Sequence, residues 1–250
     1  HTLSGQSIGA FLTSIEHVDV LSVGLNCSFG AVEMLPFLRE VARDCQCAVS
    51  CHPNAGLPDS MGRYTQTPEE MAVAVRRFAE EHLVNIVGGC CGTTPQHIAA
   101  IAREVSNMAP RPFGVVPHQP MLRLSGLERL TLTPEMRFVN VGERCNVAGS
   151  RKFLRLINEK SYEEACTIAR RQVEDGAMVL DINLDDGLLD TEREMVHFLR
   201  LLGADPEVAR VPFMIDSSRW EVIRAALKCC QGKCIVNSIS LKGGEAEFLS

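Results

Sequence analysis

Short apolar runs alternate with amphipathic segments along most of this chain. The apolar runs are rich in β-branched residues and almost continuously apolar, which is typical of buried parallel strands. Strands alternating with helices at this spacing favour βαβ units, and therefore a parallel sheet or barrel. The predicted strands are Val18–Leu25, Cys47–Cys51, Val84–Gly88, Phe138–Val141, Ala177–Ile182, Pro212–Ile215 and Cys234–Ile239.

The segments between these strands repeat apolar residues every three or four positions, as helices do. Residues 34–42 and 162–173 each show such an apolar face. Two helix starts are also marked. Residues 67–70 (Thr-Pro-Glu-Glu) predict an N-cap, a proline in the first turn and a capping-box glutamate, and Thr-Pro at 94–95 repeats the cap and the proline.

A proline-rich segment interrupts this rhythm and divides the chain. Residues 110–136 lack helical periodicity and are predicted to be an interdomain linker between domains at 1–109 and 137–250. The two domains have about three and about four βα repeats, whereas a complete barrel has eight. The predicted fold class is therefore α/β, with parts of two consecutive (β/α)8 TIM-type barrels. Leucines of the linker are expected to pack on a domain surface: Leu122, Leu124, Leu127 and Leu130.

Composition narrows the possible functions. The 250 residues include 25 basic and 31 acidic side chains, with a net charge of -6, so no basic nucleic-acid surface is expected. No apolar run approaches the ~18 residues of a membrane span. The chain starts at His1 without a secretion signal, which predicts a cytoplasmic protein whose N-terminus is missing. In that compartment, 11 cysteines favour metal binding or catalysis over disulfides.

Polar and thiol side chains stand where the predicted strands end. In a parallel barrel these positions converge on the C-terminal face, where active sites are built. A single polar strand end has a plain explanation, because loops are solvated, but a whole series favours a functional face. The series is Asn26 and Cys27, His52 and Asn54, Cys90 and Cys91, Arg144 and Asn146, Asp181 and Asn183, Asp216, and Asn237.

The most specific motif is Gly88–Gly92, Gly-Gly-Cys-Cys-Gly. Adjacent cysteines rarely form a disulfide with each other, but two thiolates can bind one tetrahedral metal. Cys27, at the end of another strand, is the natural third ligand. A zinc ion on Cys27, Cys90 and Cys91 would keep one position open, which is the pattern of a catalytic site.

The remaining cysteines are assigned mainly to packing. Cys45, Cys47 and Cys51 have a spacing that is awkward for one metal, so core packing is favoured. A rival metal site at Cys229, Cys230 and Cys234 is disfavoured, because the first two end a helix and the third opens a strand.

Three segments, residues 24–27, 52–58 and 84–95, resemble the last three βα units of homocysteine methyltransferase barrels. This resemblance implies that Cys27, Cys90 and Cys91 hold zinc for homocysteine. It also suggests that Asn54 approaches the metal when no substrate is bound.

The second half of the chain resembles the pterin-binding superfamily, which includes dihydropteroate synthases and folate:corrinoid methyltransferases. The matching segments are residues 138–153, 180–183, 215–218 and 235–238. The resemblance implies that Asp216 and Asn237 contact the pterin ring, with Asn237 also near the folate nitrogen that leaves. Further residues implied to line the folate are Gly149, Ser150 and Arg151, and less directly Asp181 and Asn183.

A homocysteine zinc barrel joined to a pterin barrel is the arrangement of cobalamin-dependent methionine synthases, with the first barrel represented by its C-terminal part and the second by its N-terminal part. The resemblance implies methyl transfer from 5-methyltetrahydrofolate through methylcobalamin to homocysteine, in methionine biosynthesis. The cobalamin-binding module would lie outside this chain, and the isolated chain is expected to be inactive.

Three alternatives stay open. A cobalamin-independent homocysteine methyltransferase, such as a betaine-dependent one, would leave Asp216 and Asn237 without a role. A dihydropteroate synthase relative would leave Cys90 and Cys91 without one. A non-catalytic zinc or pterin-binding scaffold would call for a closed site with four protein ligands.

Overall fold

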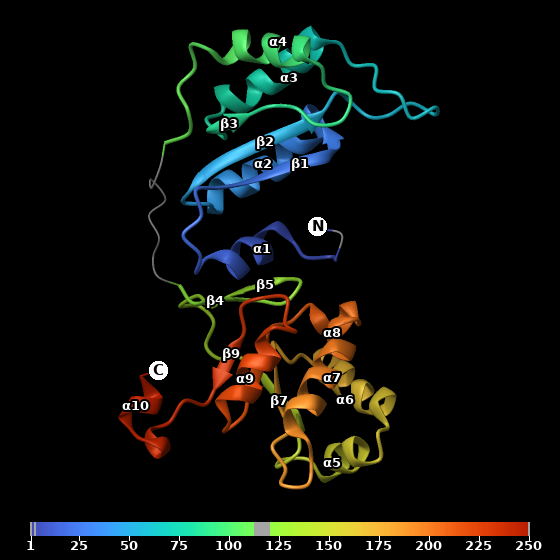
Figure 1. Cartoon of the computed structure of the whole chain (residues 1–250), viewed down its shortest axis with the longest axis vertical. Helices are drawn as coiled ribbons and strands as arrows, with labels where there is room; N and C mark the ends of the chain where they lie inside the picture. The colour runs from blue at the N-terminus through green and yellow to red at the C-terminus, as the bar shows by residue number, and fades with distance from the viewer. Residues whose placement is uncertain (1, 3, 113–120, 250) are drawn as a thin grey trace. The chain divides into compact units, whose positions relative to one another are not determined.

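The computed structural model describes residues 2, 4–112 and 121–249 (Figure 1). Contacts divide the chain into two compact units. The first unit is Glu16–Gln119, and the second joins His1–Ile15 to Pro120–Ser250. By contact, the N-terminal residues 1–15 thus group with the second unit; the domain boundaries drawn from the sequence remain a prediction.

The first unit is built around a three-stranded parallel sheet in the order β1-β2-β3. Helices follow each strand, as the βαβ pattern predicts. The elements are β1 (Ser22–Gly30), α2 (Ala31–Asp44), β2 (Ala48–Asn54), α3 (Pro68–Glu80), β3 (Ile86–Val87) and α4 (Pro95–Val105).

Both marked helix starts are confirmed. Thr67 caps α3, where its side chain accepts a hydrogen bond from the Glu70 backbone N–H and the Glu70 carboxylate accepts one from the Thr67 N–H. At α4 the Thr94 N–H donates to Nδ1 of His97 at 3.2 Å. The predicted apolar face of α2 is buried against the sheet: Met34, Leu38, Val41 and Ala42.

The second unit contains a four-stranded parallel sheet in the order β6-β7-β8-β9. Its core includes Phe153 and Phe198, whose ring centroids lie 5.2 Å apart. The elements are α1 (Ile8–Ile15), β4 (Arg123–Ser125), β5 (Arg129–Thr131), β6 (Val141–Asn146), α5 (Arg151–Asn158), α6 (Tyr162–Glu174), β7 (Val179–Asn183), α7 (Thr191–Gly203), α8 (Pro206–Ala209), β8 (Phe213–Asp216), α9 (Trp220–Leu227), β9 (Ile235–Asn237), the 3-10 helix η1 (Leu241–Gly243) and α10 (Glu245–Phe248).

Part of the proline-rich segment forms an antiparallel hairpin, β4–β5, that the sequence did not predict. The Ser125 N–H donates to the Lys233 carbonyl and the Leu127 N–H to the Ala209 carbonyl, just before β9 and β8 respectively. The hairpin therefore covers the N-terminal ends of these strands. Leu124 and Leu127 are buried as expected, whereas Leu122 is exposed. Residues 113–120 of the predicted linker lie outside the described residues.

Two predicted strands are displaced along the chain. The first begins at Ser22 instead of Val18, which is exposed, and runs on to Gly30. The strand predicted at Phe138–Val141 instead spans Val141–Asn146, and Phe138 is 73% exposed. Both predictions followed apolar residues, but the strands continue through polar residues that pair with β2 and β7.

The α/β class with parallel sheets is confirmed, and strand neighbours follow chain order in both parallel sheets, as they do in a barrel.

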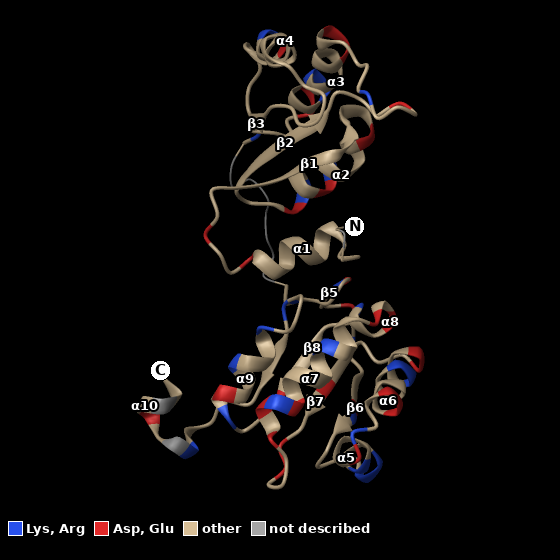
Figure 2. Ribbon diagram, turned by 45° about the vertical axis from the view of Figure 1, so that its right-hand side comes forward, with Lys and Arg blue, Asp and Glu red and all other residues tan. Residues whose placement is uncertain are grey.

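Helices α6 and α7 carry charges of both signs (Figure 2). None of the described helices combines the length and the apolarity needed to span a bilayer.

Two matched leucine substitutions would test this core. Leu199 of α7 is fully buried, whereas Leu188 is 94% exposed. Leu199→Ala is expected to lower the free energy of unfolding of the second unit by about 2–5 kcal/mol, through lost burial and a cavity. Leu188→Ala should change it by less than about 0.5 kcal/mol. Urea unfolding followed by fluorescence of Trp220, the only tryptophan, reports on this unit; equal effects of the two substitutions would contradict the packing.

Candidate functional site

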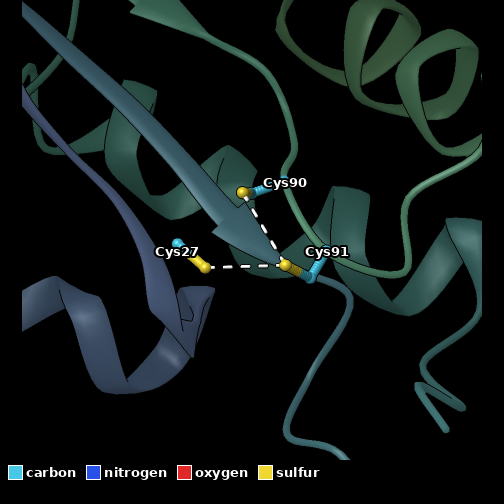
Figure 3. Close-up of side chains that lie close together, drawn as sticks. All are labelled: Cys27, Cys90 and Cys91. Carbon is cyan, nitrogen blue, oxygen red and sulfur yellow. Dashed lines mark hydrogen bonds between the residues drawn. The ribbon is translucent and has the colours of Figure 1, made fainter.

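Three thiols of the first unit meet as the sequence predicts. The sulfur of Cys91 lies 3.5 Å from that of Cys27 and 4.0 Å from that of Cys90, and the three sulfurs lie within 4.8 Å of one another (Figure 3). Around a tetrahedral zinc with Zn–S bonds of about 2.3 Å, sulfur atoms are roughly 3.8 Å apart. The thiols therefore fit one zinc ion with little rearrangement.

An irregularity in β1 places Cys27. Asn26 pairs with His52, but the next paired residue, Gly30, pairs with Asn54. Between these two pairs β1 therefore advances by four residues and β2 by only two. Within this bulge Cys27 has φ 61° and the next residue, Ser28, has φ 65°. Each left-handed, non-glycine residue costs about 1–3 kcal/mol. This strain is concentrated where a strand must turn one thiol toward its partners.

The loop that carries Cys90 and Cys91 is fastened to the end of β2. The Cys90 N–H donates to the Pro53 carbonyl at 2.8 Å, and the Ala55 N–H donates to the Cys91 carbonyl at 2.9 Å. The Asn54 side chain is 2% exposed, and its Oδ1 accepts a hydrogen bond from the Cys91 N–H at 3.1 Å. Asn54 is thus a positioning residue for the thiol pair.

The glycines of this loop allow its close packing. Gly92 has φ 78°, and a Cβ there would come within 2.3 Å of the Tyr64 Cβ. A Cβ on Gly88 would come within 2.6 Å of the His52 ring. Tyr64 therefore packs directly on the thiol loop, a contact that the sequence does not predict because long-range packing leaves no local motif.

The pKa values of two of these thiols, Cys27 and Cys91, are shifted in opposite directions. The pKa of the Cys27 thiol is lowered, first by a hydrogen bond from the Ser28 backbone and then by the thiols of Cys91 and Cys90 and the side chain of Asn54. The pKa of Cys91 is raised, chiefly by its hydrogen bond to Cys27. Cys27 therefore loses its proton more readily than Cys91, and a bound metal would displace the proton of Cys91.

Cys27, Cys90 and Cys91 form the one set of three potential ligands this close among the described residues. The rival set of Cys229, Cys230 and Cys234 does not meet that condition.

In the second unit, polar residues form a row across the carboxyl ends of all four strands of the sheet. Each residue of the row pairs in register with the next. The row is Asn146, Asn183, Asp216 and Asn237. Two of these, Asp216 and Asn237, are the residues expected to contact a pterin.

Asn146 connects this row to the loop that follows β6. Its Nδ2 donates to Oδ2 of Asp181 at 2.9 Å and to Oδ2 of Asp216 at 3.3 Å. Its Oδ1 accepts from the backbone N–H groups of Ala148 and Gly149, at 2.9 and 3.2 Å. The sequence placed Asn146 at a strand end without assigning it this central role.

Asp181 is the buried member of this cluster, with 2% of its surface exposed. Burial raises its pKa, the charges of Asp216 and Glu143 add to the effect, and the hydrogen bond from Asn146 opposes it. Desolvation thus makes the charged form of Asp181 less favourable than it would be in water.

The other predicted folate residues lie around this edge. Ser150 caps α5, accepting a hydrogen bond from the Phe153 N–H at 3.2 Å, and Arg151 is the exposed first residue of that helix. Asn237 ends β9, and its backbone carbonyl accepts from the Ser217 N–H at 2.8 Å. The helix cap gives Ser150 a structural role; the ligand roles of all these residues remain predictions.

The role of Asp185 was not predicted from the sequence. Its Oδ1 accepts from the Ser217 hydroxyl at 2.8 Å, and its Oδ2 accepts from the backbone N–H and the hydroxyl of Ser218, at 2.7 and 2.8 Å. It thereby joins the loops after β7 and β8. The only local signal was an aspartate two residues beyond the strand.

Comparison with known families agrees with both resemblances. Residues 1–105 match the family model of homocysteine S-methyltransferase, and residues 142–250 match that of pterin binding enzymes. The chain therefore combines a region similar to homocysteine S-methyltransferases with a region similar to pterin binding enzymes, which supports a methyltransferase acting with homocysteine and a pterin or folate.

The raised pKa of Asp181 predicts a pH dependence of stability. A carboxyl with a raised pKa in the folded state stabilises the protein at low pH, and this contribution is lost as the pH rises from the ordinary value of 3.8 through the raised value. Asp181→Asn should therefore gain stability over wild type at neutral pH, and the difference should shrink toward pH 3.8. Urea midpoints measured from acidic to neutral pH test this, and parallel curves for the two proteins would contradict it.

Proposed function

We propose that the chain takes part in methyl transfer from 5-methyltetrahydrofolate, by way of cobalamin, to the thiol of homocysteine, giving methionine and tetrahydrofolate. The observation that carries this proposal is the convergence of Cys27, Cys90 and Cys91 in the region that matches homocysteine S-methyltransferases. The pterin-binding match in the same chain supports a folate as the methyl donor.

On the homocysteine side, Cys27, Cys90 and Cys91 would hold zinc. Zinc bound by three thiolates would leave a fourth position for the homocysteine sulfur and lower the pKa of its thiol, making a nucleophile at neutral pH. The protein's own part is to keep the three sulfurs at this spacing. The β1 bulge does so for Cys27, and Asn54 for the loop of Cys90 and Cys91.

On the folate side, the row from Asn146 to Asn237 supplies both donors and acceptors. Carboxylate oxygens of Asp216 would accept from pterin N–H groups, whereas the Asn237 amide can both donate and accept. Asn146 holds Asp216 in place through its 3.3 Å hydrogen bond. A hydrogen bond or proton near Asn237 would make the folate nitrogen a better leaving group.

Cobalamin enters the proposal through the fusion of the two regions, which is the arrangement of cobalamin-dependent methionine synthases. As methylcobalamin it would carry the methyl group between the two sites, bound by a module outside this chain. Cytoplasmic location and a role in methionine biosynthesis belong to the same proposal.

Zinc content and X-ray absorption at the zinc edge test the metal centre. The wild-type chain should bind one zinc through three sulfurs, rising to four with homocysteine, because homocysteine would fill the open position. Loss of an outer-shell partner already costs roughly 10–100-fold in metal affinity, so Cys90→Ser, which removes a ligand, should cost more than about 100-fold.

Cys166→Ser makes the same change on α6 of the second unit, at a cysteine that is not one of the three predicted ligands, and should bind zinc as wild type does. Absence of zinc from the wild type, or a site of four protein ligands that ignores homocysteine, would sink the catalytic proposal.

Calorimetric titration with tetrahydrofolate tests the pterin site. Asp216→Ala should weaken binding roughly 10–100-fold, because a hydrogen bond to a charged group contributes about 1.5–3 kcal/mol. Asp175→Ala removes a carboxylate whose side chain is 74% exposed in the turn before β7, and should leave the affinity unchanged. Equal affinity in all three proteins would remove Asp216 from the site.

A further inference from the structure

A second group of thiols lies at the other end of β2 from Cys27. Cys45 is the C-cap of α2, and Cys47 directly precedes β2. Their sulfur atoms are 3.1 Å apart, and the Cys45 sulfur also lies 3.7 Å from the Cys47 carbonyl oxygen. The backbone of Cys45 is extended, with φ -90° and ψ 135°. In extended chain, residues i and i+2 project to the same side, which explains how the two thiols meet.

A buried arginine fixes the backbone around this pair. Arg111 is 6% exposed. Its guanidinium donates to the Ala42 carbonyl at 3.2 and 2.8 Å, to the Cys47 carbonyl at 3.1 Å, and also to the Cys45 carbonyl. Arg111 therefore supplies a hydrogen-bond donor to a carbonyl at the C-terminal end of α2. The same guanidinium binds the backbone carbonyls of both cysteines. These hydrogen bonds fix the backbone that carries the two thiols, so the folded chain keeps the two sulfur atoms close together.

We propose that Cys45 and Cys47 form a reversible disulfide and are a site of oxidation by small disulfides such as glutathione disulfide. Cys47 is partly exposed and Cys45 is 5% exposed, so Cys47 reacts first. Its thiolate attacks one sulfur of the oxidant, forming a mixed disulfide and releasing one glutathione. The Cys45 thiolate then attacks the Cys47 sulfur and releases the second glutathione. The two thiols lose two electrons and two protons, and the oxidant's S–S bond is reduced to two thiols.

A third cysteine nearby provides an internal comparison. Cys51 is fully buried in β2, and its sulfur lies 3.8 Å from the Met34 sulfur. Burial raises its pKa to about 12. Burial also raises the pKa of Cys45, to about 11, although the Arg111 charge opposes this. The second step should therefore quicken as the pH rises, whereas Cys51 should stay reduced.

Peptide mapping of the zinc-loaded chain in glutathione redox buffers tests the site. Trypsin cuts after Arg43 and Arg63, so Cys45, Cys47 and Cys51 share one peptide. After alkylation, the expected product carries a disulfide between Cys45 and Cys47 and an alkyl group on Cys51. Because folding brings the thiols together, the folded chain should be oxidised at a ratio of glutathione disulfide to squared glutathione about tenfold lower than the urea-unfolded chain.

Alkylation of all three cysteines in oxidising buffer would overturn the proposal. So would a disulfide that includes Cys51, or equal oxidation of the folded and unfolded chains. None of these results would bear on the proposed methyl transfer, because they concern neither the three predicted zinc ligands nor the row from Asn146 to Asn237.

Two variants sharpen the test. Cys45→Ser should accumulate glutathione on Cys47, because no second thiol remains to displace it; a Cys47 free of glutathione in this variant would contradict the order of attack. Cys51→Ala should form the same disulfide as wild type. The wild-type map stands by itself if either variant fails to fold.

Discussion

The in-register pairing of parallel strands is the constraint on which both sites depend. The carboxyl ends of parallel strands in register lie at a common edge of the sheet, so the residue that ends each strand is brought to that edge. In the second unit, four residues that are far apart in sequence therefore form one row: Asn146, Asn183, Asp216 and Asn237. In the first unit the same edge needs one departure from regular pairing. The bulge at Cys27 supplies it.

Both sites carry local costs that the surrounding structure offsets. Two left-handed residues sit at the thiol site, and a buried carboxyl, Asp181, lies beside Asp216. Neither arrangement would persist on a mobile loop. Asn54 and Asn146 bear on this directly, because each uses a side-chain amide to tie a functional loop to the end of a strand. These two amides tie the thiol loop and the loop after β6 to the rigid sheets.

The sequence predicted what is encoded locally. Helix caps such as Thr67, the strand–helix alternation, and the pair Cys90-Cys91 each have a short signature, and Cys27 followed from its place at a strand end. The β4–β5 hairpin was not predictable, because its partners, the carbonyls of Ala209 and Lys233, lie far along the chain. The exact bounds of β6 were not predicted, for a similar reason. Its polar residues are strand only because β7 pairs with them.

The cysteines show why residue type alone does not assign chemistry. Cys27 receives a backbone hydrogen bond that stabilises its thiolate, and it lies close to two further thiols, an arrangement that could hold a metal. Cys51, on the neighbouring strand, is fully buried, and this burial raises the pKa of its thiol. Cys45 lies between these extremes, buried yet close to another thiol and to the Arg111 cation. Since the three lie within 25 residues of one another in sequence, roughly the length of one βα unit, the differences arise from which atoms the fold places beside each sulfur.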